Sequence, residues 1–212
     1  MPWFYYVGKI LVRMLLLFTR CRVRGKENVP TQGALLIVAN HLSLADPPIL
    51  GVSLGRRVAF MAKQELFHSR FLSYFVRCLG AFPVHRGRLD RRAMRQASQL
   101  LTQGQALVMF PEGKRSESTG LQPASRGSAL IAFRNSVPIL PVGVTGTEKI
   151  KGVAWILHRP QITVNIGPRF YLPPVSSKLT KVELDELTEA IMEHIAELLP
   201  PEYQGNYASQ GD

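Results

Sequence analysis

Apolar runs of strand length alternate with segments of helical length along most of the chain. The runs occupy residues 34–39, 58–62, 81–85, 106–110, 138–144 and 162–166. The segments with helical length and spacing are 47–54, 69–79, 90–103 and 128–135. Alternation of this kind is typical of domains in which helices cover a largely parallel sheet. The pattern therefore predicts an α/β fold with a mixed, largely parallel central sheet flanked by helices.

Residues 180–198 carry the pattern of a structural helix. Thr180 and Glu183 have the spacing of a capping box, and an apolar stripe from Leu184 to Leu198 follows. Beyond Pro200 the chain is polar. We expect one domain over residues 27–200 and a flexible tail over residues 201–212.

The first stretch of the chain is apolar on nearly all sides. Residues 3–18 are interrupted only by Gly8, Lys9 and Arg13. As a helix they would measure about 24 Å, short of a comfortable bilayer crossing. No charge precedes the apolar part and no small residues mark a cleavage site, which argues against a signal peptide. We expect residues 1–26 to form a membrane-interfacial helical segment with Trp3 at headgroup depth.

Two alternatives stay open for this segment. It would cover the domain's own core if its apolar surface faced inward. Whether it lies on the membrane or spans it is not decided by the pattern.

The net charge of the chain indicates what kind of partner it binds. The 212 residues contain 26 Lys and Arg against 15 Asp and Glu, a net charge of +11. This surplus indicates an anionic partner: a membrane surface, a phosphorylated substrate or nucleic acid. No nucleic-acid-binding motif is present, so we expect no nucleic acid partner. The two cysteines have no metal-ligand spacing, and free thiols in a reducing compartment are the simplest interpretation.

Candidate chemistry begins where the first apolar run ends. His41 and Asp46 lie between that run and the helical segment that follows it. An imidazole held by a carboxylate is the basic unit of general-base catalysis. Each residue also has a structural interpretation, because Asp46 before proline suits a helix N-cap and a single histidine is more often a buried core residue.

Basic residues follow two later runs. Arg86 ends one strand, and the loop after the next carries Glu112, Gly113, Lys114 and Arg115. Guanidinium groups bind phosphate oxygens through a bidentate fork, so these strand ends predict a phosphate pocket beside His41. Single arginines at strand ends are usually solvated charges; it is the grouping that favours a site.

Four motifs in order give the chain a family resemblance. Residues 40–46 match the signature N-H-x4-D, residues 80–86 read G-A-F-P-V-H-R, residues 110–116 read F-P-E-G-K-R-S, and residues 137–142 read V-P-I-L-P-V. Together they resemble the 1-acylglycerol-3-phosphate O-acyltransferase family of glycerolipid acyltransferases. The resemblance covers residues 40–142. One departure is Lys114, where the family usually has Thr, and it leaves the exact acceptor open.

The resemblance implies a reaction and roles. An acyl group would pass from acyl-CoA or acyl-acyl carrier protein to the sn-2 hydroxyl of lysophosphatidic acid, giving phosphatidic acid. His41 would be the base and Asp46 its orienting partner, without a resident cofactor or metal. The phosphate would be held by Arg86, Glu112, Gly113, Lys114 and Arg115. The acyl donor or cleft wall would involve Lys63, Arg126, Val137, Pro138, Ile139 and Pro141.

The sequence leaves other functions open. The acceptor would otherwise be glycerol 3-phosphate or another lysophospholipid. From a different class, the chain would be a basic membrane-binding protein without catalysis. Ser43 lacks the surroundings of a nucleophile elbow and is expected to make a turn hydrogen bond. We expect the protein at the cytoplasmic face of a membrane, monotopic or peripheral.

Overall fold

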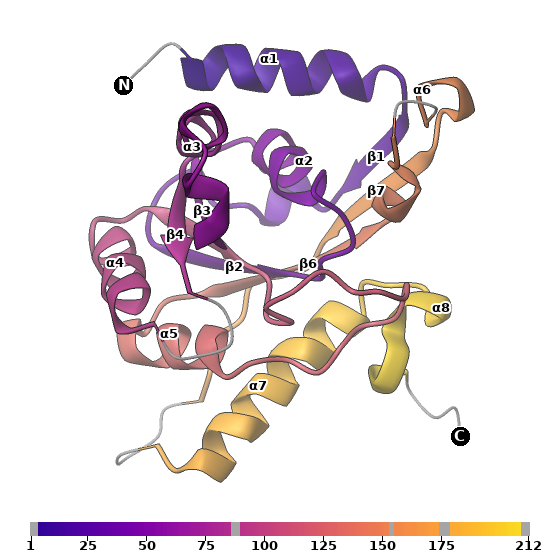
Figure 1. Cartoon of the computed structure of the whole chain (residues 1–212). Helices are drawn as coiled ribbons and strands as arrows, with labels where there is room; N and C mark the ends of the chain where they lie inside the picture. Colours follow the sequence, from indigo (N-terminus) through magenta and orange to yellow (C-terminus); the bar gives the residue numbers. More distant parts are fainter. Residues whose placement is uncertain (1–3, 86–89, 153–154, 174–178, 209–212) are drawn as a thin grey trace.

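A seven-stranded sheet forms the centre of the molecule in this computed structural model, which describes residues 4–85, 90–152, 155–173 and 179–208 (Figure 1). The strands are β1 (Arg20–Arg24), β2 (Leu35–Ala39), β3 (Val58–Lys63), β4 (Ala81–Val84), β5 (Ala106–Met109), β6 (Ile139–Thr145) and β7 (Gln161–Ile166). Their order is β1-β7-β6-β2-β5-β3-β4. Only β6 and β7 pair antiparallel among these strands. The predicted α/β fold with a mixed, largely parallel sheet is confirmed.

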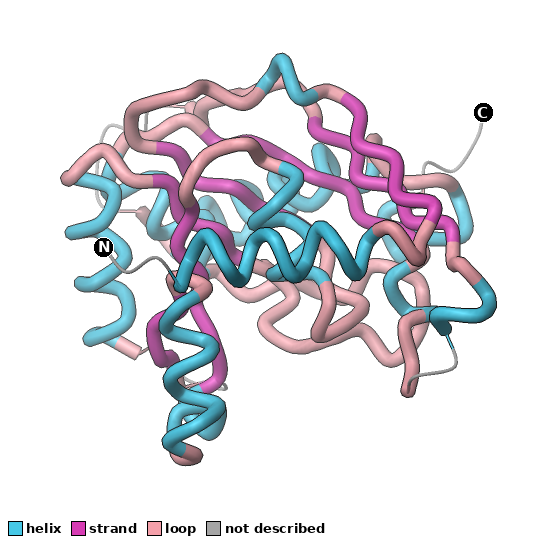
Figure 2. The backbone as a smooth tube through the Cα atoms, turned by 90° about the horizontal axis from the view of Figure 1, so that it is seen from above, coloured by secondary structure: helices cyan, strands magenta, loops and turns pink. Residues whose placement is uncertain are grey.

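Helices lie on both sides of the sheet, as Figures 1 and 2 show. They are α1 (Phe4–Leu16), α2 (Asp46–Ser53), α3 (Arg70–Cys78), α4 (Arg91–Thr102), α5 (Gly127–Asn135), α6 (Trp155–His158), α7 (Lys181–Ala196) and α8 (Pro201–Gln204). Short 3₁₀ turns η1 (Lys26–Asn28), η2 (Gln64–Phe67), η3 (Thr147–Lys149) and η4 (Gly205–Tyr207) join them. Helices α1, α2 and α3 lie on one side, and α4, α5 and α7 on the other.

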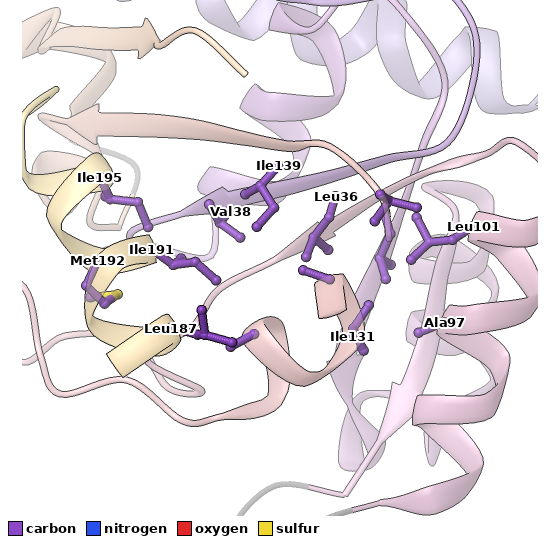
Figure 3. Packing of buried hydrophobic residues seen from close by; sticks show 14 of the residues in the cluster. Leu36, Val38, Ala97, Leu101, Ile131, Ile139, Leu187, Ile191, Met192 and Ile195 are labelled. Atoms are coloured by element: carbon purple, nitrogen blue, oxygen red, sulfur yellow. The ribbon is translucent and has the colours of Figure 1, made fainter. Parts of the chain in front are cut away.

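The central strand β2 is buried on both faces because each face meets a separate apolar cluster. Leu36 and Val38 join the cluster under α4, α5 and α7. Leu35 and Ile37 join the opposite cluster, which includes Leu50 of α2. Figure 3 shows the first cluster, in which Leu187 and Ile191 of α7 reach toward the sheet. Burial on both faces fixes β2, and with it the position of the residues that follow.

Helix α7 begins at the predicted capping box. The Thr180 hydroxyl accepts a hydrogen bond from the Glu183 amide, and the Glu183 carboxylate accepts one from the Thr180 amide. Helix α7 then packs against α5, β6 and β2. The structural role expected for this helix is confirmed.

The expected helical segment over residues 1–26 is too long. Helix α1 ends at Leu16, and β1 follows as an edge strand paired in parallel with β7. Alternate residues of β1 explain the difference: Cys21 and Val23 face the core, while the arginines between them are exposed. Charges on an exposed edge strand also discourage pairing with other chains.

Pro141 lies in β6, an interior strand between β7 and β2, although proline cannot donate a hydrogen bond to a neighbouring strand. The proline is tolerated because β6 and β7 first pair at Val142, and the Pro141 carbonyl accepts a hydrogen bond from the Gly167 amide (3.0 Å). Residues 201–207 were expected to belong to a flexible tail, but they form α8 and η4, and Tyr203 is buried.

Candidate active site

His41 and Asp46 meet directly after the carboxyl end of β2. Nδ1 of His41 lies 2.8 Å from Oδ2 of Asp46, and both side chains are buried. An ionised carboxylate can only accept a hydrogen bond, so Nδ1 carries the proton and Nε2 keeps its lone pair. This arrangement leaves Nε2 as the nitrogen that can take a proton from a substrate.

The carboxylate of Asp46 is held by several donors. Oδ2 also accepts hydrogen bonds from the amides of Leu42 and Ser43, each at 2.7 Å. Oδ1 accepts one from the hydroxyl of Thr147, which is fully buried at the end of β6. Donors on both oxygens fix the carboxylate in one orientation.

The N-cap interpretation of Asp46 is therefore wrong. Ala45 is the N-cap of α2, with no side-chain cap hydrogen bond, and Asp46 is the first helical residue. Its carboxylate turns back to the amides that precede the helix, because the same oxygen faces His41. The expected turn hydrogen bond of Ser43 is present, from the Ala45 amide to the Ser43 hydroxyl at 3.3 Å.

Neighbours on either side hold the histidine. Asn40 spans to β6: its side-chain amide donates to the Val144 carbonyl (2.8 Å) and its oxygen accepts from the Val144 amide (2.7 Å). The His41 ring stacks on Phe110, with centroids 4.1 Å apart and an angle of 20° between the planes. Phe110 follows β5, so the two neighbours of β2 in the sheet both contribute to the position of His41.

Glu112 supports His41 through the backbone. Its Oε1 accepts from the His41 amide (2.8 Å), and its Oε2 accepts from the Gln122 amide (3.1 Å). Burial raises the pKa of Glu112 to about 7; the two amide hydrogen bonds oppose this rise, and the charge of Asp46 adds to it. Glu112 was predicted to bind phosphate, and the structure places it as a brace between two loops.

The loop after Glu112 runs back to the dyad. Gly113 has a φ of +69°, a conformation that favours glycine, and the Ser116 amide donates to the His41 carbonyl at 2.8 Å. Between them Lys114 and Arg115 are exposed. The loop that carries these two predicted phosphate-binding cations thus contacts the backbone of His41 through Ser116. Arg86, the third, lies outside the residues that the structure describes.

The residues predicted for the acyl donor are spread apart. Lys63 ends β3 on the same edge as the dyad and pairs with Glu65 (3.1 Å). Arg126 is exposed and forms an ion pair with Asp185 of α7 through Nε and Nη2. The remaining four belong to β6 or precede it, where all but Pro138 are buried: Val137, Pro138, Ile139 and Pro141. These four are not brought to His41, because the dyad meets β6 at its other end, at Val144.

A second pair with the same spacing shows what sets the dyad apart. His85 and Asp90 are also five positions apart, with Nδ1 2.8 Å from Oδ2. The side chain of His85 is 46% exposed, against 5% for His41. Asp90 caps α4 through the amides of Arg92 and Ala93, and its pKa lies below the usual range chiefly because the His85 amide donates to it. Burial and bracing, rather than spacing, distinguish His41 and Asp46.

Thr147 is the functional residue that sequence reasoning missed. It lies 101 positions from Asp46, and no local motif marks it. The turn that carries it begins at Gly146 (φ +83°), and a glycine directly after an apolar strand was the available signal. Helix α8 supports the same turn, because the Tyr203 hydroxyl donates to Glu148 at 2.9 Å.

The described residues contain no group of three or more His, Cys, Asp and Glu side chains arranged to hold a metal ion. None of the helices within them has both the length and the apolar character needed to cross a membrane.

Comparison with known proteins assigns the class. The family model described as Acyltransferase matches residues 20–145, which include His41, Asp46 and Glu112 but end before Thr147. The chain belongs to the Acyltransferase family. Its parallel sheet and the buried histidine and aspartate after β2 are the parts that the match covers.

Individual relatives narrow the resemblance. A 1-acyl-sn-glycerol-3-phosphate acyltransferase of Bacillus subtilis (strain 168) is 28% identical over 178 residues, which are 84% of this chain and 87% of the relative. One of Streptococcus pneumoniae is 28% identical and covers 77% of this chain and 60% of the relative. The crystal structure of the 1-acyl-sn-glycerophosphate (LPA) acyltransferase PlsC from Thermotoga maritima matches with a TM-score of 0.69 and 29% identity, over 92% of this chain and 78% of that one.

Proposed function

We propose that this protein transfers a fatty acyl group from an acyl thioester to the sn-2 hydroxyl of 1-acyl-sn-glycerol 3-phosphate, giving phosphatidic acid. The observation that carries the proposal is the buried pair of His41 and Asp46, with Nε2 left to accept a proton. The activities named for the relatives from Bacillus subtilis and Thermotoga maritima support this acceptor.

The mechanism is a direct transfer. Nε2 of His41 takes the proton as the acceptor hydroxyl attacks the thioester carbonyl, a carbon–oxygen bond forms, and the carbon–sulfur bond breaks. The proton then passes to the departing thiolate. Asp46 keeps the imidazole in the required tautomer and stabilises the imidazolium. Lys114 and Arg115 hold the acceptor phosphate together with Arg86, so that the hydroxyl arrives oriented.

The donor is acyl-CoA or acyl-acyl carrier protein, and the protein needs no further cofactor. Both donors are anionic, which suits the net charge of +11. We place the reaction at the cytoplasmic face of a membrane, where α1 lies in the interface. Helix α1 packs on α2 and α3, and it leaves Ile10, Met14 and Leu15 exposed.

The test is turnover of purified protein in mixed micelles with lysophosphatidic acid and each donor in turn. His41→Ala removes the base, and we expect kcat to fall by about 10²- to 10⁴-fold. His194→Ala is the control, because His194 lies on α7, away from the site. Wild-type turnover in His41→Ala would contradict the role of His41 as the base. Lipid binding without turnover in the wild type would favour a basic membrane-binding protein without catalysis.

A further inference from the structure

A cavity lies at the edge of the sheet opposite the dyad. Its volume is about 710 Å³, and its lining includes Gly33, Val58, Ala81 and Gln105. These residues precede or begin β2, β3, β4 and β5, which run parallel. His41 follows the other end of β2. The cavity is therefore separate from the dyad by the length of the strands.

The lining of this cavity is cationic. It contains Arg56, Arg57 and Arg77, together with the amide side chains of Gln32, Gln96, Gln103 and Gln105. No Asp or Glu is among the described residues that line it. Arginine and amide groups without a carboxylate make a surface of hydrogen-bond donors and positive charge, which favours an anion.

Contacts within the protein orient two of the arginines without neutralising them. Arg56 donates from Nη1 to the Pro30 carbonyl (2.8 Å) and from Nη2 to the Gly33 carbonyl (2.7 Å). Arg77 donates to the Ser73 hydroxyl (3.3 Å) and lies 5.1 Å from the Phe67 ring centroid. These partners are uncharged, so the positive charge remains available to a ligand. Burial also lowers the pKa of Arg56, as expected for a cation that lacks an anionic partner.

Glycines in the lining allow a ligand to approach the backbone of the cavity closely. Gly33, Gly80 and Gly104 line it, and all three have positive φ. No atom lies within 4 Å of the position that a Cβ would take at Gly33 or Gly104. A ligand can therefore approach the backbone there more closely than a side chain would allow.

We propose that this cavity is a second anion site, which binds a phosphate-bearing ligand outside the catalytic centre. Three guanidinium groups match the oxygens of a phosphate ester, and the volume accommodates more than the phosphate alone. One source is a phospholipid headgroup, because the cavity borders α3 and α1 packs on α3 (Figure 1). Gly8 of α1 faces Leu79, the neighbour of Gly80 in the lining. The other source is a soluble phosphate ester.

The test is a titration of the full chain, in micelles, with inorganic phosphate, monitored by nuclear magnetic resonance. Backbone amides of the glycines report on binding near each of them. We expect saturable shifts of the Gly33, Gly80 and Gly104 amides. Gly113, beside the dyad, reports separately on the catalytic edge. In the double variant Arg57→Gln/Arg77→Gln, the apparent Kd from the cavity reporters should rise at least tenfold.

The matched control is Arg134→Gln/Arg169→Gln, which changes the net charge equally at exposed arginines outside the cavity. Its apparent Kd should equal that of the wild type. Equal affinities in the two double variants, or an absence of shifts at the three cavity glycines, would overturn the proposal. A fall in kcat in the cavity variant alone would overturn its separation from the catalytic centre.

Vesicles identify the source of the phosphate. Cosedimentation is compared between phosphatidylcholine vesicles and vesicles that also contain phosphatidic acid. If phosphatidic acid no longer increases the cosedimentation of the cavity variant but still increases that of the control variant, the ligand is a lipid headgroup. If both variants keep this increase while the glycine shifts still weaken, the ligand is a soluble phosphate ester.

Discussion

At the scale of single residues, catalytic geometry depends on which side chains hold Asp46 and His41. Thr147 donates to the Asp46 oxygen that does not face His41, and Glu112 accepts from the His41 amide. Neither residue needs to touch the substrate. Their contribution is to keep Nε2 of His41 in place while charge develops on the ring.

Replacing Thr147 by Val removes the hydroxyl and preserves the shape. Asp46 then loses one buried donor, which costs about 1–3 kcal/mol of stability. We expect kcat to fall about tenfold with KM unchanged, because the substrate-binding groups are untouched. Steady-state kinetics with lysophosphatidic acid measures both. Thr147→Ser keeps a hydroxyl and should restore most of the activity, and a Val variant with full kcat would show that the contact is only structural.

The raised pKa of Glu112 predicts that the free energy of unfolding depends on pH. The unfolded chain releases this proton near the ordinary pKa of 4.5 and the folded chain near 7, so the folded state binds more protons between them. The free energy of unfolding should therefore fall as pH rises through this window, by up to about 3 kcal/mol. Glu112→Gln should remove that slope in denaturation curves at pH 5 and pH 8. Glu117→Gln, at an exposed position of the same loop, should keep it; parallel curves for wild type and Glu112→Gln would refute the idea.

Local spacing predicts the dyad but not its supports. His41 and Asp46 lie five positions apart, so one short stretch of sequence reveals both. Thr147 and Gln122 reach the site only because β6 and the loop after β5 fold against β2, at separations that no motif records. The same limitation explains why a helix N-cap was an alternative interpretation of Asp46: the N-cap pattern is local, and the amides that Asp46 contacts precede the helix.

At the scale of elements, the strands and the longer helices follow from the hydrophobic pattern, whereas β1 and the short helix α8 do not. Six of the strands are apolar runs, which periodicity detects directly. Strand β1 alternates arginine with Cys21 and Val23, and it fell within the segment over residues 1–26 that was expected to be helical. The pairing of β1 with β7 involves residues more than a hundred positions away, so the sequence near β1 does not show it.

The turn between β6 and η3 predicts that replacing Gly146 by alanine lowers the free energy of unfolding strongly. Gly146 has a φ of +83°, and a Cβ there would collide with the Gln161 carbonyl oxygen. Gly146→Ala should lower the free energy of unfolding by more than about 3 kcal/mol, since strained backbone and a clash add. Gly104→Ala is the control, because its φ is +72° with open space around the added methyl. It should cost about 1–2 kcal/mol in the same urea titration, and equal losses in the two variants would contradict the role of the clash.

At the scale of the whole molecule, apolar surface is unequal on the two sides of the sheet. Leu17, after α1, is 72% exposed, and Val182 of α7, across the sheet, is 66% exposed (Figure 1). An exposed leucine that enters a bilayer contributes about 1.5–3 kcal/mol. The proposed orientation, with α1 in the interface, therefore assigns different effects to similar substitutions at these two positions.

Vesicle flotation tests this asymmetry. Leu17→Gln should lower the partition coefficient on anionic vesicles about tenfold, because one buried apolar side chain is lost. Val182→Gln should leave it unchanged. Equal effects of the two substitutions would contradict the proposed orientation.

The pairing of β1 with β7 has a consequence for synthesis. Strand β1 ends at residue 24, and its neighbour in the sheet, β7, begins at residue 161. At ribosomal rates of about 5–20 residues per second, roughly 7 to 30 seconds pass before that neighbour emerges. During this interval Leu17 and Phe18, exposed even in the finished fold, precede a strand without a partner. With α1 in the interface, as proposed, the amino-terminal segment would have time to reach a membrane before the sheet closes, and delivery to the bilayer would precede completion of the enzyme.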